Sequence, residues 1–348
     1  MINKKLLAEI CEVAGAPGHE QRVREIVIKQ VKPLVDEIRI DNMGNVVAIK
    51  KGKERKKVMI AAHMDEIGFI VTHVDDQGFI YFHTLGGFDP KTLTAQRVII
   101  HGKKDVIGVM GSKPIHLMSV ADRAKVPTIK DYFIDTGMTK KELDKLISVG
   151  DTITRDRKLI EMGECLNCKS MDNRVSVFIL IEMLREMKNT PAYDVYAVFT
   201  VQEEIGIRGA NVSAMDINPD FGFGLDTTIA WDTPGSTKQE RVSALGEGAC
   251  IKVMDSSTVC DYRMVAYMKD IAQKKKIKTQ LEILPAGGTD TSGIQRMNPG
   301  GSIAGAVSIP TRHIHQVIEM VNKKDVRSAI DLLRGCVENL HLYDWNFK

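Results

Sequence analysis

The sequence predicts an α/β protein with a mixed, mostly parallel sheet, helices on both faces of that sheet, and an inserted small β-rich domain. Strand-like and helix-like segments alternate in the second half of the chain. The run Val58–Ala62 is continuously apolar, as in a strand buried on both faces. Short β-prone pieces crowd the stretch between residues 68 and 157. We therefore expect residues 1–67 and 158–348 to form one domain and residues 68–157 to form the insertion.

The first part of the chain predicts two helices followed by strands. Apolar residues recur at helical spacing in residues 4–14 and 20–32. Residues 38–40 and 45–49 predict paired strands around a turn at residues 41–44. In the insertion, turn sequences separate strands that we expect at residues 69–74, 79–83, 97–101, 106–110 and 152–153, with one helix at residues 140–147.

After the insertion, helices and strands alternate again. Helices are expected at residues 174–187, 259–276 and 323–340, and strands at residues 195–200, 221–225, 279–284 and 303–308. In open α/β sheets, functional groups gather at the carboxyl ends of the strands. Polar side chains that follow these strands are therefore the first candidates for a site.

Composition and charge exclude several classes of protein. Lys and Arg number 48 and Asp and Glu number 45, so the net charge is only +3, and basic residues are scattered apart from short runs. We therefore expect neither a nucleic acid nor a membrane as partner. The N-terminus begins like a signal peptide, but Glu9 and Glu12 interrupt its apolar run. A cytoplasmic protein is the expectation.

The six cysteines do not predict a structural metal site. In a chain of this length without a secretion signal they are expected to be reduced. Cys165-Leu166-Asn167-Cys168 has the spacing of half a zinc site, but no second ligand pair of similar spacing exists. The role of Cys165 and Cys168 stays open.

Two adjacent acids, Glu203 and Glu204, are the most informative feature of the chain. They follow the apolar run of residues 195–200, and Gly206 comes soon after them. On an extended chain, adjacent side chains point in opposite directions. One of these carboxylates could thus bind a metal ion while the other moves a proton.

Other candidate ligands also lie at or beyond strand ends. His63 and Asp65 follow the apolar strand, and a carboxylate close to a histidine can orient an imidazole that binds a metal. Asp172 precedes a predicted helix, where an N-cap role is the alternative. Asp226 ends another strand. His313 and His315 follow the strand at residues 303–308, and either of them could be a ligand.

Together these residues indicate a dinuclear metal site. Two histidines and three carboxylates form a ligand set for two divalent ions. The set is His63, Asp172, Glu204, Asp226 and one histidine of the 313/315 pair. Glu203 is then left free to act as a base.

The chain resembles the tetrahedral aminopeptidases, a family of dinuclear metallo-aminopeptidases that includes glutamyl and leucyl aminopeptidases and some members named endoglucanase. The resemblance covers essentially the whole chain and keeps the motif order. The motifs are Ala62-His63-Met64-Asp65-Glu66-Ile67-Gly68, Met171-Asp172-Asn173-Arg174, Gln202-Glu203-Glu204-Ile205-Gly206, Gly287-Gly288-Thr289-Asp290 and Ile309-Pro310-Thr311-Arg312-His313-Ile314-His315.

The resemblance implies a role for each site residue. Glu203 is the general base, Asp65 orients His63, and Asp172 bridges the two ions. His63 and Asp226 bind one ion and Glu204 binds the other. The family's last ligand aligns with His315, whereas His313 stands where a tyrosine is common in the family.

The resemblance also implies cofactors, substrates and assembly. It implies removal of single N-terminal residues from short peptides, with two divalent ions in each subunit. Zinc is the first expectation, and cobalt and manganese are alternatives. It further implies a zinc-exopeptidase-like main domain, and an inserted PDZ-like domain that forms dimer contacts, in many members within a dodecamer. A homo-oligomer is therefore expected.

Three other functions stay open at the level of the sequence. A metal-dependent deacylase of small N-acyl metabolites would use the same chemistry. An endoglucanase would need two carboxyl groups flanking a sugar bond, and the chain offers only two tryptophans to stack on sugars. A non-enzymatic interaction protein would lack a ligand or the base. The sequence does not indicate whether acidic, basic or apolar N-terminal residues are preferred.

Overall fold

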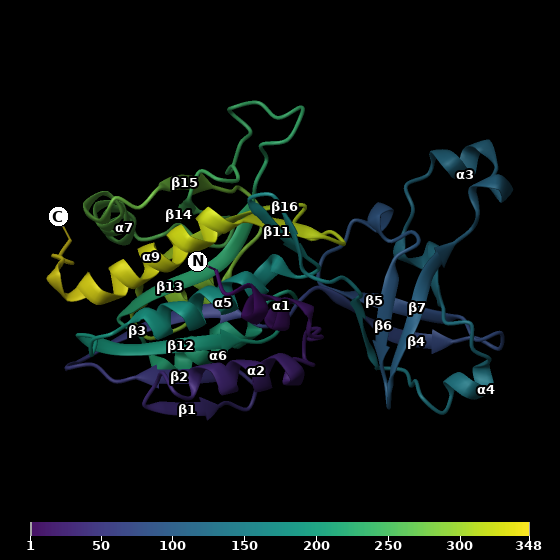
Figure 1. Ribbon diagram of the computed structural model, residues 1–348, viewed down its shortest axis with the longest axis horizontal. Coiled ribbons are helices and arrows are strands. Elements are labelled where there is room, and N and C mark those ends of the chain that lie inside the picture. The colour runs from purple at the N-terminus through teal and green to yellow at the C-terminus, as the bar shows by residue number, and fades with distance from the viewer. Residues whose placement is uncertain (1, 348) are drawn as a thin grey trace.

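The computed structural model describes residues 2–347, which form a large α/β part and a separate closed β-barrel (Figure 1). The sheet of the α/β part has 11 strands in the order β1-β2-β12-β3-β13-β16-β17-β11-β10, and β14 and β15 extend it from β16. The strands are β1 (Glu37–Ile40), β2 (Val46–Lys50), β3 (Glu54–His63), β10 (Ile160–Met162), β11 (Cys165–Cys168), β12 (Tyr193–Thr200), β13 (Phe221–Ile229), β14 (Ala249–Met254), β15 (Thr279–Ile283), β16 (Ile303–Arg312) and β17 (Glu319–Asn322).

The sheet is mixed, as predicted, and its parallel pairings are concentrated in its long central strands. The four central strands β12, β3, β13 and β16 are parallel to one another. The strands at the flanks pair antiparallel, so that among the described residues four pairings are parallel and six are antiparallel. Three of the antiparallel pairings join consecutive strands, which need only a short connection, whereas parallel neighbours need a longer crossover.

Helices cover both faces of the sheet, as predicted. Alternate residues of the central strands point to opposite faces. On β3, Ile60 packs in the cluster that includes α5, α7 and α9, whereas Met59 packs with α6 and α8. The helices are α1 (Lys4–Glu12), α2 (Gln21–Val31), α5 (Met171–Glu186), α6 (Arg208–Ile217), α7 (Tyr262–Lys275), α8 (Asp290–Arg296) and α9 (Lys323–Asn339).

Two glycines of β13 let α8 lie directly against the sheet. A Cβ atom on Gly222 would lie 2.1 Å from Ile294 Cγ2, and one on Gly224 would lie 1.9 Å from Thr291 Oγ1. The side chains of Phe221, Phe223 and Leu225 point to the opposite face, into the main core. Close packing of α8 brings the Gly287–Asp290 motif to the edge of the sheet where β3 and β12 end.

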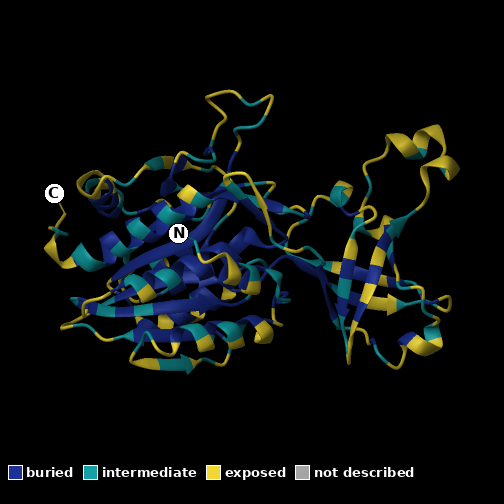
Figure 2. Cartoon of the chain, in the orientation of Figure 1, coloured by how far each residue is buried: buried dark blue, intermediate teal, exposed yellow. Residues whose placement is uncertain are grey.

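The β-rich insertion folds as a six-stranded closed barrel with its own apolar core. Its strand order is β4-β5-β8-β7-β6-β9. The elements are β4 (Gly68–Val74), β5 (Ile80–Leu85), β6 (Arg97–His101), β7 (Asp105–Ser112), α3 (Val120–Ala124), β8 (Tyr132–Asp135), α4 (Lys140–Leu143) and β9 (Thr152–Arg155). An arm around α3 extends away from the barrel and is largely exposed (Figure 2).

Neither a membrane span nor a disulfide is found among residues 2–347. No helix there is both long enough and apolar enough to cross a membrane, and the cytoplasmic location stays a prediction. All six cysteines are free thiols. Cys165 and Cys168 lie on β11, where the backbone pairs with β17, and Cys168 Sγ donates a hydrogen bond to the Arg157 carbonyl.

Candidate metal centre

The candidate site lies where the four central parallel strands end. His63 is the last residue of β3 and is 1% exposed. Asp226 lies near the carboxyl end of β13, opposite Ser308 of β16. Because parallel strands end at a common edge, side chains that are far apart in the sequence meet there.

Three further elements supply the remaining candidate residues. Glu203 and Glu204 lie in the segment after β12, Asp172 lies in the first turn of α5, and His315 follows β16. Glu203 and Glu204 do not point to opposite sides of a strand, because β12 ends at Thr200 and Gln202 has a φ of 55°. Both carboxylates line the same cavity of about 550 Å³, with His63, Asp172, Asp226 and His315.

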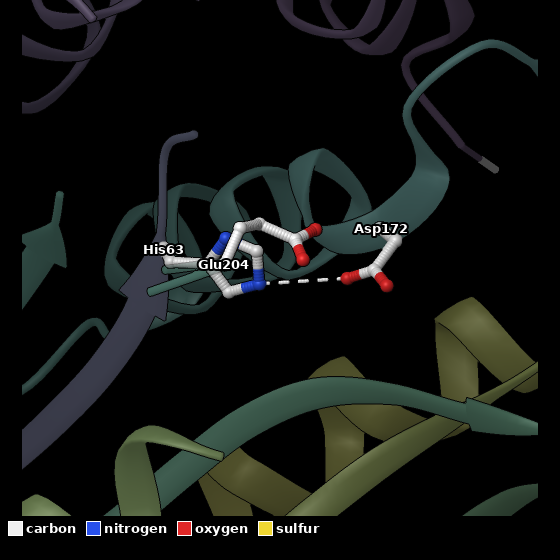
Figure 3. Close-up of side chains that lie close together, drawn as sticks. All are labelled: His63, Asp172 and Glu204. Carbon is white, nitrogen blue, oxygen red and sulfur yellow. Dashed lines mark ion pairs between the residues drawn. The ribbon is translucent and has the colours of Figure 1, made fainter. Parts of the chain in front are cut away.

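Asp172 stands between the two histidines. Its Oδ1 lies 3.4 Å from His63 Nε2, and its Oδ2 lies 3.2 Å from His315 Nε2. Figure 3 shows the Asp172 carboxylate facing the His63 ring, with Glu204 beside it. One carboxylate therefore presents one oxygen to each histidine, which is the arrangement that a bridging ligand needs.

Each histidine also faces a carboxylate of its own. His63 Nε2 lies 3.7 Å from Asp226 Oδ1, and His315 Nε2 lies 3.3 Å from Glu204 Oε2. One ligand atom each from His63, Asp172 and Glu204 lies within 4.8 Å of the others. The geometry thus divides into two halves that share Asp172.

The site carries more negative charge than its own histidines offset. Burial raises the pKa of Glu203 well above its usual range, and repulsion from Asp226 adds to this. Burial would lower the pKa of His315, but Glu204 and Asp172 raise it to about 12. Shifts in these directions show a site whose carboxylates favour a nearby positive charge, as divalent cations would supply.

The donor set fits divalent metal ions. Oε1 of Glu204 is buried and has no hydrogen-bond partner within the structure, and a buried carboxylate oxygen without a donor is costly unless a cation or water meets it. Imidazole nitrogens and carboxylate oxygens together are ordinary ligands of zinc and of similar ions.

Asp65 joins two of the ligand-bearing segments. Its carboxylate accepts hydrogen bonds from the backbone N–H groups of Glu203 and Glu204, each at 3.1 Å. His63 Nδ1 lies 3.1 Å from the Asp65 carbonyl oxygen and 3.5 Å from its carboxylate. The predicted contact with His63 is therefore made more closely by the backbone of Asp65, while its side chain holds the loop after β12.

The structure separates the two histidines of the 313/315 pair. His315 lies against Asp172 and Glu204. His313 lines a different cavity, beside Lys91 and Arg157. Only His315 joins the candidate site.

Several site residues could not be identified from the sequence. Lys252 and Asp255 line the cavity as a buried pair, with Nζ 3.0 Å from Asp255 Oδ2, and Glu282 lies behind them. Lys252 belongs to β14, a strand that the sequence did not predict, and Asp255 follows that strand, whereas Glu282 lies on β15. Asp290 was part of a motif without an assigned role, and its Oδ2 accepts a hydrogen bond from Thr200 Oγ1.

Comparison with known proteins confirms the predicted resemblance. The model of the M42 glutamyl aminopeptidase family matches residues 44–332. A protein of Acetivibrio thermocellus named putative aminopeptidase is 37% identical over 329 residues, which cover 94% of this chain and 96% of that protein.

Solved structures agree with this result. An aminopeptidase from the archaeon Desulfurococcus kamchatkensis superposes with a TM-score of 0.92 at 38% identity, covering 96% of this chain and 94% of that one. The TET1 peptidase of Pyrococcus horikoshii has a TM-score of 0.85 at 28% identity, covering 96% and 98%. That peptidase is described as able to assemble into a tetrahedron or a large octahedral shell.

Proposed function

Because the chain belongs to the M42 glutamyl aminopeptidase family and is therefore a peptide-bond hydrolase, we propose that it removes single N-terminal residues from short peptides at the site described above. One observation carries this proposal most directly. Asp172 presents separate oxygens to His63 and His315, at 3.4 and 3.2 Å, within a cavity that Glu203, Glu204 and Asp226 also line.

Two divalent ions would share this site. His63 and Asp226 would hold one ion, His315 and Glu204 would hold the other, and Asp172 would contribute an oxygen to each. We propose zinc as the metal, with cobalt or manganese as alternatives. When bound, such ions lower the pKa of a water molecule and polarise the scissile carbonyl group.

Glu203 is the proposed general base. Its Oε2 lies 3.8 Å from His63 Nε2, and the residue is 9% exposed and lines the cavity. The carboxylate would take the proton of the attacking water and later give it to the leaving amine. Asp65 would act as a positioning residue, because its carboxylate holds the backbone of Glu203 and Glu204.

The apolar part of the cavity lining would receive the side chain of the N-terminal residue. It includes Ile229, Leu284 and Ala286. The described lining residues of the cavity include no phenylalanine, tyrosine or tryptophan, which argues against a sugar-binding site and hence against an endoglucanase. Deacylation of a small N-acyl metabolite is kept as an outcome of the test below.

Metal removal and reconstitution test the proposed activity. Dialysis against a chelator should abolish hydrolysis of chromogenic aminoacyl substrates, and zinc, cobalt or manganese should restore it at two ions per subunit. The same samples should release amino acids from short peptides and leave N-acyl amino acids intact. Full activity after complete metal removal, or faster turnover of the N-acyl compounds, would contradict the proposal.

We also propose that residues 68–157 form a PDZ-like dimerisation domain and that the protein is a homo-oligomer, up to a dodecamer. The arm around α3 exposes apolar side chains, with Ile115 60%, Leu117 71% and Val120 85% exposed. Exposed apolar clusters commonly mark contact surfaces. The assemblies described for the Pyrococcus horikoshii peptidase support this reading.

Light scattering during gel filtration would test the assembly. The unchanged protein should elute as an oligomer. A variant with Leu117→Lys and Val120→Lys should elute as a smaller species, because two charges then occupy the apolar surface. As a control, Lys125→Glu on the same arm should change the mass less. A monomeric unchanged protein would refute the proposal.

A further inference from the structure

A buried cluster of five charged side chains lies between the barrel and the candidate metal centre. Each of the five is at most 2% exposed. The members are Glu66, Arg155, Lys169, Arg174 and Glu319. None is among the proposed metal ligands. Such a concentration of buried charge is costly unless its contacts are specific, so each contact merits a separate description.

Glu319 connects two segments that carry proposed ligands. Its Oε2 accepts a hydrogen bond from the backbone N–H of Asp172 at 2.8 Å. Its Oε1 accepts one from the backbone N–H of His315 at 3.2 Å. The side chains of these same two residues meet at 3.2 Å. Glu319 therefore fixes the two backbones at the separation that their side chains require.

Arg155 is the contribution of the barrel to this arrangement. It is the last residue of β9, and its Nη1 donates a hydrogen bond to the carbonyl of Gln316, the residue after His315. The same Nη1 lies 3.9 Å from Glu319 Oε1. Glu66 has Lys169 and Arg174 as nearer cations, at most 3.5 Å away. In contrast, the cation that pairs with Glu319 among residues 2–347 is Arg155.

The backbone of His315 needs such support. Its φ is 58°, in the left-handed region that residues with a Cβ atom seldom adopt. A conformation of this kind persists where the surrounding contacts impose it. The hydrogen bonds from His315 N to Glu319 and from Arg155 to the Gln316 carbonyl act on both sides of that residue.

We propose that Glu319 and Arg155 are positioning residues for the metal centre, and that the barrel thereby completes the site within each subunit. We name this pair the Glu319 clamp. It would hold the His315 loop against Asp172, so that the half-site of His315, Glu204 and Asp172 is formed before an ion binds. The proposal rests on the proposed function for the metal, and it gives the barrel a role besides contacts between subunits.

Metal binding to the full-length metal-free protein tests the clamp. We would titrate cobalt(II) into Glu319→Gln and Arg155→Met and follow heat and visible absorption. Outer-shell partners of metal ligands typically contribute about 10- to 100-fold in affinity. One of the two ions should bind weaker by such a factor, with an altered absorption band, while the other keeps its affinity. The double variant should lose little more affinity for cobalt(II) than whichever single variant binds it more weakly, because the two residues act together.

Arg22→Gln is the matched control. Arg22 on α2 forms a bidentate pair with Asp105 on β7, at 2.8 Å for both contacts, and so joins the barrel to the α/β part at an exposed place. This variant should bind both ions as the unchanged protein does. If it weakens the same ion as strongly as Arg155→Met, general docking of the barrel explains the result and the clamp is wrong. Wild-type affinities in Glu319→Gln would also overturn it.

Hydrogen exchange separates the clamp from the proposed function. The amide protons of Asp172 and His315 should exchange at least several-fold faster in Glu319→Gln than in the unchanged metal-free protein, and should not change in Arg22→Gln. If the unchanged protein binds no ion but these amides exchange faster in Glu319→Gln, the proposed metal centre is wrong, whereas the role of Glu319 in holding the two backbones is supported. If the amides do not respond, the clamp fails. Arg155→Lys, which keeps the charge, replaces Arg155→Met if the latter does not fold.

Discussion

Replacing Glu203 with glutamine should lower kcat by about 100- to 10,000-fold, the range expected for loss of a general base, while both metal ions remain bound. The amide has the shape of the carboxylate but cannot accept the water proton. Glu203 is not needed for the compact group formed by His63, Asp172 and Glu204. The measurements are kcat on a chromogenic aminoacyl substrate and metal content by mass spectrometry.

Two comparison variants make this result specific to Glu203. Glu204→Gln should lose metal as well as activity, because Glu204 Oε2 lies 3.3 Å from His315 Nε2 and its Oε1 has no other partner. Glu247→Gln, at an exposed carboxylate whose side chain is 59% exposed, should behave as the unchanged protein. Near-normal turnover in Glu203→Gln would show that Glu203 is not the general base.

The central strands were predictable because their sequences are continuous apolar runs, as expected of strands buried on both faces. The run of residues 58–62 is apolar at every position and lies in β3, and residues 195–200 lie in β12. Strands buried on both faces need such runs. Since chemistry in this class gathers at their carboxyl ends, the acids and histidines that follow them could be identified as one site.

The short strands at the flank could not be predicted in this way. β10 is exposed along its length, and β17 is a four-residue strand that begins with a glutamate. Their conformation depends on pairing with β11 rather than on local preference. Glu319 lies on β17, so its position beside the candidate metal centre could not be predicted either.

Helix α8 and the buried charged cluster are further features that the sequence did not predict. The sequence of α8 contains Gly293 and two hydroxyl side chains, Thr291 and Ser292, which do not predict a helix. The packing of α8 depends on Gly222 and Gly224. Arg155 and Glu319 act on backbone groups of other segments. Contacts between a side chain and a backbone group produce no recognisable sequence motif, because almost any residue can offer an N–H or a carbonyl group.

Replacing Asp172 with alanine should abolish binding of at least one ion and weaken binding of the other. Both histidines face this single carboxylate, so its removal takes an oxygen from each half of the site. The loss of affinity should exceed the roughly 100-fold that an outer-shell residue contributes. Measurement of metal content after dialysis, and of hydrolysis on the same sample, checks both effects.

Thermal unfolding distinguishes loss of metal from loss of fold in this variant. A ligand at 100 times its Kd stabilises the folded state by about 2.7 kcal/mol, so added zinc should raise the Tm of the unchanged protein but not that of Asp172→Ala. Without metal, the variant should still unfold cooperatively but at a lower Tm than the unchanged protein, because burial would raise the pKa of Asp172 but His315 and His63 lower it, so the ionised carboxylate stabilises the folded state at neutral pH. Asp144→Ala, at an exposed acid in the loop after α4, should keep the response to zinc. Among the carboxylates of the described site, only Asp172 presents one oxygen to His63 and the other to His315. An unchanged metal content in Asp172→Ala would therefore show that Asp172 does not bridge the ions.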